Sequence, residues 1–116
     1  MIPEGGAFVC KARHAKFVVL ESGRTVKLEI HGEYDLACGD AAKTSSEHVA
    51  ERLSREMDTL VVDLSAMTFF DAAGIAYLLR LEHIARIVSA DYRVEGANST
   101  VRRLLEIVEL DHVLAE

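Results

Sequence analysis

The chain has 116 residues, half of them hydrophobic, which is enough for one domain with a real core and too few for two. Its 13 Lys and Arg against 19 Asp and Glu give a net charge of -6, which disfavours nucleic acid and anionic membranes as partners and favours a basic protein surface. No run approaches the roughly 18 apolar residues that cross a bilayer, and the opening MIPEGGAF lacks a secretion signal, so we expect a cytoplasmic protein without membrane insertion.

The first part of the chain predicts an arm followed by a β-hairpin. Residues 1–15 mix glycines and basic residues with little periodicity, which indicates a flexible arm or a marginal first strand. We therefore place the folded domain at residues 16–116. From Phe17, two apolar runs flank Ser22 and Gly23, and the second run alternates with polar residues, which is typical of a hairpin with one covered face.

The middle of the chain predicts a helix and a central strand. Residues 40–57 carry apolar residues at near-helical spacing in a polar stretch, which indicates an amphipathic helix. Residues 59–64, TLVVDL, are apolar without alternation, which favours a central strand buried on both faces. A helix would then cover each side of the sheet.

The second half of the chain completes an α/β fold. The expected elements are a long helix over residues 72–88, a strand over residues 91–95 and a last helix that Asn98 or Ser99 caps. With the hairpin and the central strand they predict a small mixed sheet of about four strands with helices packed against it.

The stretch FFDAAGI, from Phe69 to Ile75, lies where a buried strand ends and the longest helix begins. Open α/β sheets place their sites at this edge, and Asp71 can cap the helix there. The stretch holds neither a glycine-rich phosphate loop nor a lysine, so we expect no nucleotide and no other cofactor. The five histidines lack ligand spacing, which argues against a metal site, and no nucleophile stands near a base, which argues against an enzyme.

Three blocks of the sequence, GEYDLA, LVVDLSAMTFFDAAGIAYLLRL and RVEGANSTVRRLLEIVELDHVL, together resemble the STAS domain of the bacterial anti-sigma factor antagonist family. The resemblance covers the chain from about Phe17 to Leu114. It implies a binding module that sequesters an anti-sigma factor, usually a serine kinase of the histidine-kinase-like ATPase fold, and so frees a sigma factor. The alternative is a STAS-like subunit of a lipid ABC transporter, which would dock on an ATPase component. A homodimer stays open.

The same resemblance implies which residues meet the partner. In this family two hydroxyl residues commonly follow the motif aspartate, and the second is phosphorylated by the anti-sigma kinase; here Ala73 stands at that position and has no acceptor oxygen. The expected partner-binding residues are Asp35, Asp71, Ala72, Ala73, Gly74, Ile75 and Leu79. Ile75 and Leu79 are included because they lie off the core stripe of the predicted helix, although a broad core face is an equally valid interpretation.

The two cysteines allow a second form of control. Cys38 is expected near the start of the first helix, where a lowered pKa would let it respond to oxidants together with Cys10. Inert thiols are the favoured interpretation, because a disulfide needs Cα atoms within about 7 Å.

Overall fold

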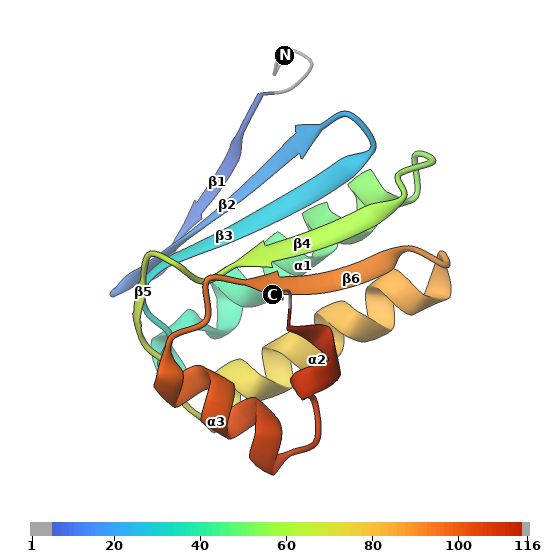
Figure 1. Cartoon of the computed structure of the whole chain (residues 1–116). Coiled ribbons are helices and arrows are strands. Elements are labelled where there is room, and N and C mark those ends of the chain that lie inside the picture. The colour runs from blue at the N-terminus through green and yellow to red at the C-terminus, as the bar shows by residue number, and fades with distance from the viewer. Residues whose placement is uncertain (1–5, 115–116) are drawn as a thin grey trace.

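The computed structural model describes residues 6–114, and within them six strands form one sheet with three α-helices on one face (Figure 1). The strands are β1 (Phe8–Lys11), β2 (Ala15–Ser22), β3 (Thr25–Glu33), β4 (Thr59–Asp63), β5 (Met67–Phe69) and β6 (Asp91–Glu95). The helices are α1 (Gly39–Leu53), α2 (Ala72–Ile87) and α3 (Ser99–Ile107), with short 3₁₀ helices η1 (Leu36–Cys38) and η2 (Asp111–Val113). None of the helices in this part of the chain is long and apolar enough to cross a membrane.

The sheet runs in the order β1-β2-β3-β4-β6, and β5 pairs with β3 beyond the end of β4. The first three strands are antiparallel, whereas β4 and β5 both pair with β3 in parallel and β6 pairs with β4 in parallel. Strands β3, β4 and β5 therefore end at the same edge of the sheet, and α2 begins directly after this edge. Sites in α/β sheets form at such an edge.

The hairpin prediction is confirmed. Strands β2 and β3 pair from Ala15–Gly32 to Ser22–Thr25, and Gly23 in the turn has φ 59°, a conformation that suits glycine. The alternation in β3 has the predicted effect, because Val26, Leu28 and Ile30 are fully buried while the polar residues between them face water.

The expectation of a helix on each side of the central strand is wrong. In β4, Leu60 and Val62 belong to the core beneath the helices, whereas Val61 faces the open side of the sheet and is still buried. Its neighbours in register are Lys27 on β3 and Arg93 on β6, whose long side chains cover apolar surface while their charges stay in water. A continuous apolar run therefore marked a central strand and not a second helical layer.

The sheet has six strands rather than about four. Residues Phe8–Lys11, within the segment predicted as an arm or marginal strand, form β1 along the edge of β2, and Met67–Phe69 form β5. Both are only three or four residues long, so neither offers enough residues for a periodic pattern. Residues 1–5 lie outside the described residues, and the division at residue 16 stays a prediction.

The helices agree with the predicted order, and local hydrogen bonds explain where they end. Asn98 caps α3, because its Oδ1 accepts from Val101 N at 2.9 Å. Helices α2 and α3 are each followed by a residue with positive φ, Ser89 at 57° and Glu109 at 61°. The next amides, of Ala90 and Leu110, then bond back to carbonyls five residues earlier at 2.9 and 2.7 Å, as in a Schellman motif.

One buried polar pair joins α1 to α2. The hydroxyls of Ser45 and Tyr77 are 2.6 Å apart, and Ser45 also donates to the carbonyl of Ala42 at 3.0 Å. The Tyr77 ring packs edge-on against Phe17. Burial raises the pKa of Tyr77, so its hydroxyl stays protonated and needs a partner.

We predict that Ser45→Ala destabilises the protein more than Tyr77→Phe does. Ser45→Ala leaves the Tyr77 hydroxyl buried without a partner, at a cost of about 1–3 kcal/mol, whereas Tyr77→Phe leaves Ser45 still bonded to Ala42 and costs about 0.5–1.5 kcal/mol. Denaturant unfolding measures both values. Ser46→Ala is the matched control, because Ser46 bonds only within α1, to Lys43. The reverse order of the two main variants would contradict the prediction.

Candidate functional site

Helix α2 begins at Asp71, which caps it as the sequence predicted. Asp71 Oδ1 accepts from the amide of Ala73 at 3.0 Å and from that of Gly74 at 3.4 Å. The carboxylate therefore satisfies two of the amides that a helix start leaves without partners. Ala72 and Ala73 form the first turn immediately behind it, with Ala72 exposed and Ala73 half-buried.

Gly74 and Ile75 face inward and support the site from below. A Cβ on Gly74 would overlap three atoms of the buried Phe70 ring, so the glycine allows this ring to lie against the helix. Ile75 is only 8% exposed and belongs to the core, so its expected position off the core stripe is wrong. The inward face of α2 is broader than the stripe suggested. Leu79, by contrast, is 44% exposed.

Asp35 follows β3 and joins two segments of the chain. Its Oδ2 lies 2.8 Å from His14 Nδ1, and its Oδ1 accepts from the amide of Ala37 at 3.0 Å, which caps η1. The hydrogen bond from His14 is the main cause that lowers the pKa of Asp35 below its usual value. His14 was not predicted to contribute, because only the fold brings residues 14 and 35 together.

Exposed apolar side chains surround the start of α2. Leu36 in η1 is 88% exposed and Phe69 in β5 is 48% exposed. The amide of Tyr34 donates to the carbonyl of Phe69 at 2.9 Å, which brings the two segments side by side. On α2, exposed residues recur at helical spacing from Ala72. We call this surface the α2 face, and it consists of Leu36, Phe69, Ala72, Ala73, Ala76 and Leu79.

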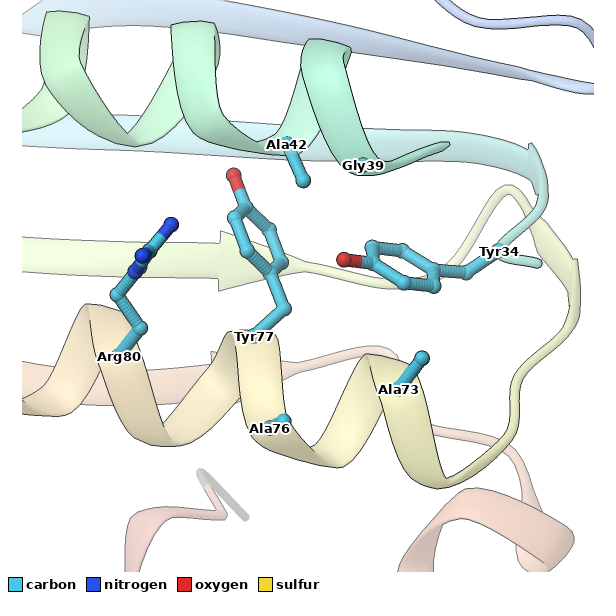
Figure 2. Close-up of a pocket in the computed structure, with 7 residues that line it drawn as sticks. All are labelled: Tyr34, Gly39, Ala42, Ala73, Ala76, Tyr77 and Arg80. Atoms are coloured by element: carbon cyan, nitrogen blue, oxygen red, sulfur yellow. The ribbon is translucent and has the colours of Figure 1, made fainter. Parts of the chain in front are cut away.

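A groove of about 350 Å³ separates the first turns of α1 and α2 (Figure 2). Small residues leave this space open: Gly39 and Ala42 on α1, and Ala73 and Ala76 on α2. The remaining lining residues are Tyr34, Tyr77 and Arg80. Ala73 therefore belongs both to the α2 face and to the groove.

Tyr34 is held rigidly beneath the groove. It is 5% exposed, and its ring contacts Phe17, Phe70 and Tyr77 at centroid distances of 5.9, 6.0 and 5.5 Å. Burial is the main cause that raises the pKa of Tyr34 to about 12, so the hydroxyl is a hydrogen-bond donor at neutral pH. Tyr34 lies in the block GEYDLA, but nothing in the sequence indicated that it lines a groove between α1 and α2.

The expected low pKa of Cys38 is wrong. Cys38 is buried, its pKa is raised, mainly by burial, and its thiol contacts the carbonyl of Glu33 at 3.6 Å. Because η1 runs into α1, Cys38 is not at an open helix start. Both Cys10 and Cys38 are free thiols in the structure. The redox hypothesis thus loses the thiolate on which it depended.

The site contains donors and apolar surface but no metal centre. Among the side chains that the structure describes, no group of three or more His, Cys, Asp or Glu residues could hold a metal ion. Its polar groups are the Asp71 cap, the Asp35–His14 pair, the Tyr34 hydroxyl and Arg80. This arrangement can bind another surface, and it offers no general base beside a nucleophile.

Three solved structures share the fold. The unphosphorylated form of the anti-sigma factor antagonist SpoIIAA matches with a TM-score of 0.72 and 18% identity, over 85% of this chain and 85% of that chain. An anti-sigma factor antagonist from Mycobacterium paratuberculosis matches with a TM-score of 0.72 and 20% identity, over 86% and 82%. The phosphorylated form of the Bacillus cell fate determinant SpoIIAA matches with a TM-score of 0.69 and 17% identity, over 85% and 88%.

A comparison with curated protein sequences finds no match. A family model described as Mlab, STAS domain, matches residues 17–116, which is most of the chain and includes both helices that line the groove. The protein therefore belongs to the STAS domain family.

Proposed function

We propose that this chain is an anti-sigma factor antagonist. It binds an anti-sigma factor of the histidine-kinase-like ATPase fold through the α2 face and so frees a sigma factor. One observation carries the proposal: the start of α2 presents alanines at the edge of the sheet where three parallel strands end, and the neighbouring segments η1 and β5 expose the side chains of Leu36 and Phe69. Burying such a surface against a partner stabilises the complex by about 25 cal/mol per Å² of apolar area.

Ala73 makes the proposed antagonist insensitive to the kinase. A phosphate here would add about -1.5 to -2 charges to the α2 face, but the methyl side chain has no oxygen to accept it. The surface therefore stays in its binding form whenever the protein is folded. The nearest serine or threonine in the sequence, Thr68, is exposed on β5 and lies five residues before the equivalent position.

A transporter subunit is the second candidate. The matching family is described as Mlab, STAS domain, and this description does not mention anti-sigma factors. In this alternative the same α2 face would dock on the ATPase component of a lipid ABC transporter. Affinity capture followed by mass spectrometry separates the two functions, because one predicts an anti-sigma kinase and the other a transporter ATPase.

We predict that Ala73→Asp weakens partner binding more than a hundredfold while the fold persists. An unpaired charge in an interface costs several kcal/mol, whereas an anion in the first turn of a helix stabilises it by about 0.3–1 kcal/mol. Calorimetric titration with the purified partner and a thermal melt measure the two effects.

Thr100→Asp is the matched control, because Thr100 is the second residue of α3 as Ala73 is of α2. It should alter stability similarly and leave affinity unchanged. Normal binding by folded Ala73→Asp would show that the partner binds to another surface. A large loss of thermal stability would show that Ala73 is a core residue.

We predict that Leu36→Ala weakens partner binding about tenfold or more without lowering the melting temperature. The side chain is exposed in the free protein and would become buried in the complex, where a leucine contributes about 1.5–3 kcal/mol. Ile87→Ala serves as the control, since Ile87 is also exposed but lies at the far end of α2. Equal affinities for both variants would remove Leu36 from the interface.

We predict that the cognate anti-sigma kinase adds no phosphate to this protein. Intact-mass measurement after incubation with kinase and ATP should show the unmodified mass. Ala73→Ser restores a hydroxyl at the equivalent position and should gain one phosphate. Stoichiometric phosphorylation of the unaltered chain would show that the switch has moved to another residue.

A further inference from the structure

The hydroxyl of Tyr34 differs from those of the other two tyrosines in the chain. The Tyr77 hydroxyl is 2.6 Å from that of Ser45, and the Tyr92 hydroxyl donates to the carbonyl of Leu78 at 2.9 Å. No described residue forms a hydrogen bond with the Tyr34 hydroxyl, and since none of the buried side-chain polar atoms among these residues lacks a partner, the hydroxyl itself reaches solvent in the groove although the residue is only 5% exposed. Figure 2 shows this hydroxyl directed into the groove between α1 and α2. A hydroxyl that opens onto a groove and has no partner in the fold is free to donate to a group that enters the groove.

Arg80 supplies a positive charge to the same groove. It lies two turns after Ala73 on α2, and in Figure 2 its side chain extends toward α1, beside Tyr77. The other α2 arginine, Arg86, is paired with Glu82 at 3.3 Å, whereas no carboxylate whose side chain the structure describes forms an ion pair with Arg80. The Arg80 charge acts on the Tyr34 hydroxyl, since it favours the ionised form of that group. Arg80 and the Tyr34 hydroxyl therefore line the same groove.

We propose that this groove is a carboxylate-binding site, in which Arg80 and the Tyr34 hydroxyl bind the side chain of a glutamate or aspartate of the partner protein. Arg80 would hold the carboxylate through its guanidinium, and Tyr34 would donate to one of the same oxygens. This inference rests on the proposed function, because it assigns chemistry to the surface beside Ala73.

The groove suits a carboxylate better than a phosphate. It provides one positive charge and one neutral hydroxyl donor, which balance a single negative charge and leave a phosphate dianion undercompensated. The other lining groups are small and apolar, except for Tyr77, whose hydroxyl is already paired. Asp71 also acts on Tyr34, but its carboxylate is engaged by the amides of α2. An acidic residue of a protein partner therefore fits the charge of the groove.

The site can be tested first without the partner. The probe is N-acetyl-glutamate N-methylamide, titrated into isotope-labelled protein at constant ionic strength and followed by NMR. We expect saturable shifts of the signals of Ala73, Ala76 and Arg80, with binding in the millimolar range. The neutral glutamine analogue should not reproduce these shifts, and inorganic phosphate should bind more weakly than the glutamate probe.

Three variants test which side chains bind the glutamate probe. Arg80→Gln should lower the affinity for the probe about tenfold or more, and Tyr34→Phe should lower it roughly threefold to tenfold. Arg86→Gln, the matched control on the same helix, should leave probe binding unchanged. Tyr34→Phe should also leave the melting temperature nearly unchanged, because the hydroxyl that it removes opens onto the groove and has no hydrogen-bond partner among the described residues. Equal shifts with the neutral analogue, full binding by Arg80→Gln, or tighter binding of phosphate would each overturn the proposal.

A second titration, with the purified partner, separates this inference from the function on which it rests. If Ala73→Asp abolishes binding while Arg80→Gln binds normally, the carboxylate site is wrong and the docking face stands. If neither variant affects the partner, the docking face itself is wrong. Loss of affinity in both variants, together with probe binding to the free protein, supports the two proposals.

Discussion

The packing of one aromatic ring, that of Tyr34, connects the sheet to both helices of the site. Its neighbours are Phe17 from β2, Phe70 from the segment before α2, and Tyr77 from α2 itself. Phe70 can approach only because Gly74 has no side chain, and Tyr77 is fixed in turn by Ser45 of α1. The spacing of α1 and α2, and hence the groove between them, follows from these contacts.

The order of the elements could be read from the sequence because their periodicities are strong. The alternation in β3 and the caps Asp71 and Asn98 report local physics, which a sequence carries directly. The segment of β1 was left open between an arm and a marginal strand, and β5 was not predicted, since three or four residues show no period and their pairing with β2 and β3 is long-range. The open face of the sheet was missed for a similar reason, because Val61 is buried by side chains on neighbouring strands.

The site was predictable where its motif is contiguous and not where the fold assembles it. The segment from Asp71 to Gly74 could be placed at the start of a helix from its residue types alone. The pairing of Asp35 with His14, and the groove that Tyr34 and Arg80 both line, bring together residues that are far apart in the sequence. Ile75 was expected to lie off the core stripe but is buried. Helical spacing gives the direction of a side chain but not the extent of the surface packed against it.

The helices lie on only one face of the sheet, and this asymmetry has a consequence for how β3 finds its partners. Val26, Leu28 and Ile30 point toward the helices, while Lys27 and Glu29 point to water, where Lys27 lies 3.3 Å from Asp63 of β4. A shift of one residue would turn every side chain of the strand over and bury two charges beneath the helices. Pairings that are offset by one residue are therefore strongly penalised during folding.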